Sequence, residues 1–305
     1  MHPLIRSTAM SDTAAPRLAG VELGGTKAIV VLGQGTKIVE RVRIATTDAE
    51  GTLAAIRRQL ERWNNLGPIA ALGIASFGPI GITPGRADYG QMLLTPKPSW
   101  TGADVLGELK GGIAATTEIE LDVNAAALAE GRMGAARGCR DHAYMTVGTG
   151  IGVGIVSGGR LVRGQMHPEA GHMRVRRLEE DHFAGSCEYH GDCLAGLASG
   201  PALRARAGAD GATIPADHSL WPFVVDALAE ACAVLIMTLS CERIVLGGGI
   251  IVKRPELIDR IAIACAAKIK GFPPVIGDRA PIFGAKLGED AGPIGSLIIA
   301  GRAIR

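Results

Sequence analysis

The chain has 305 residues, a length that predicts two domains of about 150 residues each or one large domain. Apolar residues make up 47% of the chain and charged residues 20%, which excludes an intrinsically disordered protein. The formal charge is only +2, so the charge balance does not favour a nucleic-acid partner, and no acidic tail is present. Glycine accounts for 43 residues, about twice its usual share of roughly 7%. Aromatic residues make up only 4%, so the composition favours an α/β enzyme with glycine loops over a binding module with aromatic platforms.

The N-terminal segment 1–18 predicts a flexible arm, because it lacks the continuous apolar stretch of a secretory signal. No run of about 18 uninterrupted apolar residues occurs, so we expect no membrane partner and a cytoplasmic protein. The six cysteines are too few and too unevenly spaced for a disulfide scaffold.

The first half of the chain alternates predicted strands with predicted helices. Residues 20–33 predict two strands around a Gly-Gly turn. Apolar residues at helical spacing predict an amphipathic helix over 50–64. The stretch 80–102 is rich in Gly and Pro and predicts a long loop. The other expected elements are strands at 38–45, 71–78 and 119–123, a helix that ends over 106–111 and a helix over 124–136.

The second half begins with the same pattern, since residues 143–164 again predict strand, glycine turn and strand. Residues 165–200 show little periodicity and hold four of the seven His and two of the six Cys. We expect a long helix at 221–240, a buried strand at 243–249 and a helix that ends the chain. The pattern predicts an α/β protein with two similar halves and a cleft between them.

The glycine turns have the composition of a phosphate cradle. Glycine lets backbone N–H groups approach an oxyanion closely, and threonine adds a hydroxyl donor. No Walker sequence is present, and a strand rather than a helix follows the second turn, which excludes a dinucleotide fingerprint. One such hairpin alone is more often structural, but three glycine segments together favour nucleotide binding. The residues concerned are Gly24, Gly25, Thr26, Gly148, Thr149, Gly150, Gly152, Gly247, Gly248 and Gly249.

Asp122 follows an apolar strand at the carboxyl end where open α/β sheets bind ligands. A carboxylate there can accept a proton from a hydroxyl group as a general base. The alternative is that Asp122 only caps the helix that follows it.

Four residues predict a structural zinc site: His172, Cys187, His190 and Cys193. Two thiolates and two imidazoles at short spacing suit a closed tetrahedral site, and this segment has too few apolar residues to fold by burial alone. Coincidental free thiols are the alternative, and His167 and His182 in the same segment leave the ligand assignment open. Glu169 lies three residues before His172 and suits sugar hydroxyls, although a surface glutamate is the alternative.

Five segments resemble the ROK family of sugar kinases, and within it the bacterial zinc-containing fructokinases, over residues 19–300. The segment GVELGGTK is similar to the first phosphate motif, with Glu22 at the usual Asp position, and LDVNAAALAEG is similar to the segment that carries the catalytic Asp. The segment YMTVGTGIGVGIVSGGRLVRGQMHPEAGHM is similar to the second phosphate motif with its E-x-G-H turn. The segment CEYHGDCLAGLASGP is similar to the fructokinase zinc loop, and YGQMLLTPKPSW is similar to another fructokinase segment.

The resemblance implies an actin-like ATPase fold, with duplicated ribonuclease H-like domains, and phosphorylation of the 6-hydroxyl of a hexose, most closely fructose, by ATP with Mg²⁺. It implies Asp122 as the base, with Asn124, Glu169 and His172 at the sugar. Lys27 and Pro201 join the glycine turns near ATP. Two positions depart from the family: Ala195 replaces a common sugar-contacting Glu, and Leu121 is apolar where a polar residue is typical.

We expect a small α/β domain over 19–121 and a larger one over 122–290 that includes the zinc loop 172–200. A final helix over 291–305 packs back on the small domain, and the protein forms a homodimer. The alternatives are a ROK kinase for mannose, glucose or another hexose, a ROK repressor, and an inactive sugar sensor. A repressor needs a helix-turn-helix domain before the first glycine hairpin, and only about 19 residues precede Gly20.

Overall fold

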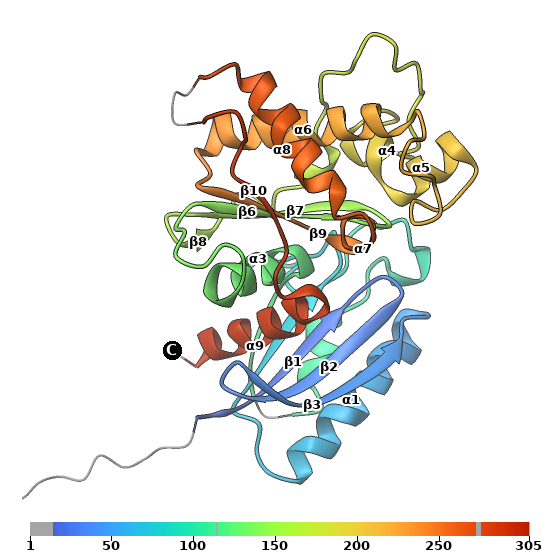
Figure 1. Ribbon diagram of the computed structural model, residues 1–305. Coiled ribbons are helices and arrows are strands. Elements are labelled where there is room, and N and C mark those ends of the chain that lie inside the picture. The colour runs from blue at the N-terminus through green and yellow to red at the C-terminus, as the bar shows by residue number, and fades with distance from the viewer. Residues whose placement is uncertain (1–14, 114, 273–275, 305) are drawn as a thin grey trace, which may run out of the picture.

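Figure 1 shows a computed structural model that describes residues 15–113, 115–272 and 276–304. Two five-stranded sheets lie one above the other, with two helices between them and further helices on their outer faces. The expected arm lies outside the described residues for its first 14 positions, while Arg17 and Leu18 already belong to a strand.

The first sheet has the strand order β3-β2-β1-β4-β5. Strand β1 is antiparallel to β2 and parallel to β4, and the hairpin expected at 20–33 is confirmed. Helix α1 begins at the side-chain cap Asp48, whose Oδ1 accepts the Gly51 amide at 2.8 Å. The elements are β1 (Arg17–Leu23), β2 (Lys27–Gln34), β3 (Lys37–Ala45), α1 (Ala49–Asn65), β4 (Ala71–Ser76), η1 (Pro98–Trp100), α2 (Val105–Lys110) and β5 (Thr116–Leu121).

The second sheet, in the order β10-β9-β6-β7-β8, repeats the pairing of the first. Strand β6 is antiparallel to β7 and parallel to β9, as β1 is to β2 and β4. Its elements are β6 (His142–Val147), β7 (Ile151–Ser157), β8 (Arg160–Leu161), η2 (Ala170–His172), α4 (Leu194–Ala198), α5 (Gly200–Ala207), α6 (Trp221–Leu239), β9 (Arg243–Gly247), α7 (Gly248–Lys253), α8 (Glu256–Ile269) and β10 (Ile282–Gly284).

Helices α3 (Asp122–Met133) and α9 (Ala291–Ala303) lie between the sheets and contact each other along their length. Their close packing requires glycine. A Cβ on Gly73 in β4 would overlap the backbone oxygen of Ser296, and one on Gly295 would overlap that of Ala125. Much of the glycine excess therefore serves helix packing against strands as well as turns.

We propose a boundary between two domains at Leu121 and Asp122, where β5 ends and α3 begins. Helix α9 follows the second sheet in the chain but contacts β1, β4 and β5 of the first, which supports assigning it to the first domain.

The structure corrects two expected boundaries. The strand expected at 119–123 ends at Leu121, because α3 already begins at Asp122. The strand expected at 243–249 ends at Gly247, because Gly248 has a φ of +86° and turns the chain into α7. Helix α8 was not expected from the sequence.

Of the described residues, helix α6 alone is long and apolar enough to cross a membrane, with a mean hydropathy of 1.9. It packs against α8 and α4, and most of its side chains are buried in the core of the second half. Burial inside the fold therefore accounts for its composition.

The buried carboxylate of Glu130, near the end of α3, binds the segment that leads back to α9. One of its oxygens accepts the backbone N–H groups of Lys286 and Leu287, each at 2.9 Å, and the other accepts that of Ala135 at 2.5 Å. Three amides that would otherwise lack partners thus converge on one side chain.

Candidate active site

Three carboxylates from separate elements interact electrostatically: Glu22 on β1, Asp122 at the start of α3, and Glu169 before η2. Burial, with the charge of Asp122 second, raises the pKa of Glu22 to about 7. The same two causes, in the same order, raise the pKa of Glu169 to about 7. Clustered carboxylates with raised pKa values are typical of sites that transfer protons.

Asp122 is the first residue of α3 and not its N-cap residue. Its Oδ1 accepts only the adjacent Val123 N–H, at 2.7 Å. The capping position is Leu121, so the capping alternative does not describe this residue. Burial raises the pKa of Asp122 to about 6, and backbone hydrogen bonds oppose that rise. The carboxylate is therefore mostly ionised at pH 7 and has a pKa close enough to neutrality for proton transfer.

Glu22 lies against the first turn of α9, where only glycine fits. A Cβ on Gly292 would overlap the carboxyl group of Glu22. The positive end of the α9 dipole favours a negative charge at this place. The positive charge of Lys27 lowers the pKa of Glu22 and is the largest of the effects that oppose its rise.

Glu169 lies beside a buried histidine. His167 is 1% exposed, and its Nε2 is 3.4 Å from the backbone N–H of Ile80. Its Nδ1 lies 3.2 Å from Oε1 of Glu169 but outside hydrogen-bonding geometry. A Cβ on Gly78 would lie 3.7 Å from both the Glu169 Oε1 and the His167 Cε1. The carboxyl group of Glu169 therefore faces the end of β4, close to Leu121.

The first glycine turn joins β1 to β2 and lies near two lysines, Lys27 at its end and Lys97 from a separate loop. The Gly24 N–H donates to the Lys27 carbonyl at 3.0 Å, which closes the turn. Lys27 Nζ lies 3.1 Å from Oε1 of Glu289. Lys97 approaches this turn from the Gly- and Pro-rich loop. A Cβ added to Gly25 would lie 3.4 Å from the Cε of Lys97. Thr26 is exposed at the tip, so the turn presents backbone donors, a hydroxyl group and two ammonium groups.

The second turn meets the other predicted nucleotide-binding segments. The Gly148 N–H donates to the Gly150 carbonyl at 2.9 Å, and the Gly200 N–H at the start of α5 donates to the Gly148 carbonyl at 2.7 Å. A Cβ on Gly148 would lie 3.7 Å from the backbone nitrogen of Gly249. Gly148 thus lies beside the three segments whose residues are predicted to bind the nucleotide. These residues are Thr149, Gly150, Pro201, Gly247, Gly248 and Gly249.

Two other predicted residues have clear packing roles. Gly152 lies inside β7, where a Cβ would be 2.8 Å from Val123 Cγ1 of α3. Asn124 is buried, and its Nδ2 donates to Oε1 of Glu120 at 2.8 Å. The other oxygen of Glu120 pairs with Arg163. Neither Gly152 nor Asn124 is shown to contact a ligand, and their binding roles remain predictions.

The four predicted metal ligands converge. The Nδ1 atom of His172 lies 3.3 Å from that of His190, and 3.6 and 3.4 Å from the Sγ atoms of Cys187 and Cys193. All four ligand atoms lie within 4.8 Å of one another. His182 and His167 lie outside this cluster, so the ligand choice that the sequence left open is resolved in favour of a candidate metal site of two histidines and two cysteines.

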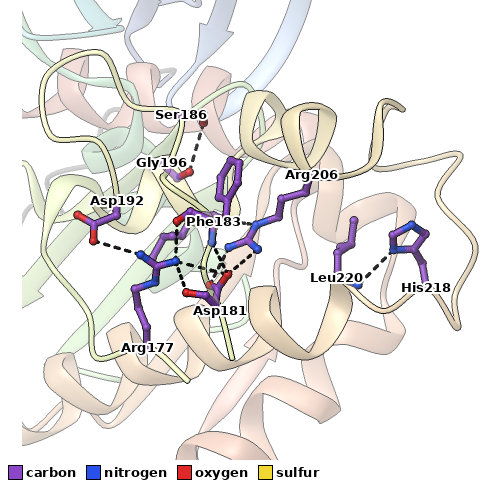
Figure 2. Close-up of polar contacts among 10 residues, drawn as sticks. Arg177, Asp181, Phe183, Ser186, Asp192, Gly196, Arg206, His218 and Leu220 are labelled. Carbon is purple, nitrogen blue, oxygen red and sulfur yellow. Dashed lines mark hydrogen bonds and ion pairs between the residues drawn. The ribbon is translucent and has the colours of Figure 1, made fainter. Parts of the chain in front are cut away.

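A salt-bridge network holds the loop around this cluster (Figure 2). Arg206 of α5 forms two hydrogen bonds of 2.8 Å with the carboxylate of Asp181. Arg177 binds the carbonyls of Asp181 and Phe183 and also reaches Asp192 at 3.3 Å. These polar anchors add to the apolar packing of Met173, Val175 and Phe183 against the core of the second half.

Sequence reasoning assigned no role to Glu22, Lys97 or Glu120, and it considered His167 only as an alternative metal ligand. Glu22 and Lys97 lie inside segments that carried the family resemblance, which was the available signal. The Arg163 contact of Glu120 spans 43 residues and the Ile80 contact of His167 spans 87, so spacing in the sequence does not indicate either contact.

Comparison with known proteins identifies the family. The ROK family profile matches residues 18–303. The chain is 37% identical to a fructokinase of Pediococcus pentosaceus, over 94% of this chain and 99% of that protein. It is 35% identical to a putative fructokinase of Bacillus subtilis (strain 168), over 94% and 96%. The solved ROK hexokinase of Thermus thermophilus has a TM-score of 0.78 at 27% identity, covering 94% of this chain and 99% of that one. The two mixed sheets have the expected actin-like ATPase fold, and the chain belongs to the ROK family.

Proposed function

We propose that the protein is an ATP-dependent fructokinase that transfers the γ-phosphate of ATP to the 6-hydroxyl of D-fructose. The observation that carries the proposal is the meeting of Asp122, whose pKa is about 6, with Glu22 and Glu169 near the carboxyl ends of β1, β4 and β5. The fructokinases described above, which match nearly the whole chain, support fructose as the substrate.

In this mechanism Asp122 accepts the proton of the 6-hydroxyl as its oxygen attacks the γ-phosphate. Glu169 and His172 bind the sugar, with Asn124 nearby on α3. The turns at Gly24–Thr26 and Gly148–Gly150 supply backbone donors to the phosphates, and Lys27 and Lys97 supply positive charge. Mg²⁺ would neutralise charge on the phosphates, and the carboxylate oxygens of Glu22 and Asp122 are the ligand type that it prefers.

We further propose that the cluster of His172, Cys187, His190 and Cys193 binds structural zinc. A tetrahedral Zn²⁺ with bonds of about 2.0–2.1 Å to nitrogen and 2.3 Å to sulfur needs N···N separations of about 3.3 Å and N···S separations of about 3.6 Å. The N···N separation of 3.3 Å and the N···S separations of 3.4, 3.6 and 3.8 Å fit that requirement. The bound ion would fix the loop that carries His172.

Other hexoses are the second candidate. Ala195 lies buried in the first turn of α4, where the resemblance expects a sugar-contacting Glu. Loss of that acceptor favours relaxed selection among fructose, mannose and glucose. An inactive sugar sensor is disfavoured by the intact carboxylate cluster, and a repressor would need a DNA-binding domain in addition to this fold. The near-neutral charge of +2 gives no electrostatic basis for binding nucleic acid or anionic membranes, which favours small-molecule partners. We propose that the kinase works in the cytoplasm.

We also propose that the protein is a homodimer that pairs through the groove between α6 and α8. This groove has a volume of about 830 Å³, and Val234, Met237 and Leu178 line it with exposed apolar surface. The adjoining run Arg176–Glu180 carries basic residues before Leu178 and acidic residues after it. A twofold axis near Leu178 would bring Arg176 of each copy to Glu180 of the other.

Asp122→Asn should lower kcat by about 10²-fold or more while folding stays intact, because it keeps the size of the side chain but cannot accept the proton. In the wild type, kcat/KM should fall as the pH drops below about 6, since the base is then protonated. Steady-state kinetics from pH 5 to 8 test both points, with the exposed Asp217→Asn as the control. A rate for Asp122→Asn close to that of the wild type would remove Asp122 from the mechanism.

A sugar panel tests the substrate. We expect fructose to have the highest kcat/KM among fructose, mannose and glucose with ATP and Mg²⁺. Ala195→Glu should raise the preference for one hexose by about tenfold if a restored carboxylate contacts the sugar. Use of another hexose but not fructose would reject the substrate and keep the kinase, whereas no phosphorylation of any hexose would reject both.

Elemental analysis should find one zinc per chain, and Cys193→Ser should lose it. We expect that variant to bind fructose more weakly, because His172 belongs to both sites. Cys139→Ser, which changes a thiol outside the cluster, is the matched control and should retain zinc. A wild-type protein without zinc that stays fully active in strong chelator contradicts the proposal.

Sedimentation velocity should show a dimer for the wild type at micromolar concentration. Arg176→Glu should give a monomer through like-charge repulsion with Glu180, and the swap of Arg176→Glu with Glu180→Arg should restore the dimer. A monomeric wild type, or a dimer that Arg176→Glu leaves unchanged, would exclude this interface.

A further inference from the structure

His167 is a buried side chain to which neither the sequence motifs nor the proposed mechanism gives a role. It lies between β8 and η2, in the segment that leads to Glu169, and is 1% exposed. Among the described side chains, its Nδ1 is one of the few buried polar atoms without a hydrogen-bond partner. A buried donor without a partner is costly, so a polar group that stays in such a place needs an explanation.

The two ring nitrogens have different surroundings. Nε2 faces the backbone N–H of Ile80 at 3.4 Å, and an N–H group can only donate, so Nε2 must be the acceptor. The proton of the neutral ring is then on Nδ1. Burial lowers the pKa of His167, which keeps the ring neutral near pH 7. Nδ1–H is therefore a donor whose nearest acidic partner is Oε1 of Glu169, at 3.2 Å.

The separation of Nδ1 and Oε1 suits a hydrogen bond, but their alignment does not. Contacts of this kind often become aligned only when the substrate binds. Glu169 is 42% exposed on its other side, so one oxygen can face His167 while the other faces the sugar. Ile80 follows β4, and the His167 ring thus links the first sheet to the sugar loop.

We propose that His167 is a positioning residue that donates its Nδ1–H to Oε1 of Glu169 and thereby orients this carboxylate toward the hydroxyl groups of the bound hexose. The inference rests on the proposed function, because it requires that Glu169 binds the sugar. His167 acts through Glu169 and does not contact the reacting atoms.

Two substitutions of His167 test the contacts of its two ring nitrogens separately. The amide nitrogen of His167→Asn can occupy the place of Nδ1 and donate to Glu169. The longer side chain of His167→Gln can accept from Ile80 at the place of Nε2 but cannot donate to Glu169. His167→Ala removes both contacts, and His182→Gln changes an exposed histidine of the same loop as the control.

We expect His167→Gln and His167→Ala to raise the KM for fructose by roughly 10- to 100-fold, the usual effect of losing a hydrogen bond to a charged group. His167→Asn should stay within about threefold of the wild type. The KM for ATP should change little in all variants, since the phosphate turns are untouched. Thermal unfolding and zinc content confirm that each variant is folded.

A double-mutant cycle with Glu169→Gln, read by calorimetric titration with fructose, tests the link directly. If His167 acts through Glu169, His167→Gln weakens fructose binding in the wild type but adds nothing in the Glu169→Gln background. Independent, multiplying effects would overturn the proposal, and so would an equal loss in the Asn and Gln variants, which indicates packing alone. Absence of hexose binding by the wild type would instead overturn the proposed function.

Discussion

The direct contact of helix backbone with strand backbone is the constraint on which the arrangement of this protein depends. Helix α9 can lie against β4 and α3 only because Gly73 and Gly295 carry no side chain at the points of contact. This packing places the first turn of α9 against Glu22, where Gly292 leaves space for the carboxyl group. The start of α3, held by the same contacts, places Asp122 within electrostatic reach of Glu22. The chemistry of the carboxylates therefore depends on the spacing of the helices.

Burial, with the charge of Asp122 as a second cause for Glu22 and Glu169, raises the pKa values of the three carboxylates to about 6 and 7. The cluster therefore does not carry its full negative charge near neutral pH. Helix N-termini and Lys27 supply compensating positive charge. Binding of a cation would relieve the remaining repulsion between the carboxylates.

Much of the fold follows from local sequence, and the site follows from it only in part. The two glycine hairpins, α1 and β4 have strong periodicity or turn signals, and each lies where it was expected within a few residues. Asp122 and the four predicted Cys and His ligands were found from the sequence because they combine reactive side chains with a strand end or with short spacing. Glu120 has neither signal, and His167 was considered only as an alternative metal ligand. Their importance comes from contacts with Arg163 and Ile80, which depend on how loops from the two sheets meet in space. Helix α8 was not predicted, although its buried residues Leu257, Ile261, Cys265 and Ile269 have helical spacing; it begins after Pro255 without a side-chain cap.

The Glu130 anchor also determines how the two sheets can move. The chain passes from the first sheet to the second along α3 and returns to α9 through residues 285–290. The first crossing lies at the N-terminal end of α3, and Glu130 fastens the second crossing near its C-terminal end. The two crossings lie near opposite ends of α3. A rotation of one sheet against the other that keeps both crossings intact must therefore have its axis along α3. Asp122 lies at one end of that axis, where a rotation displaces atoms least.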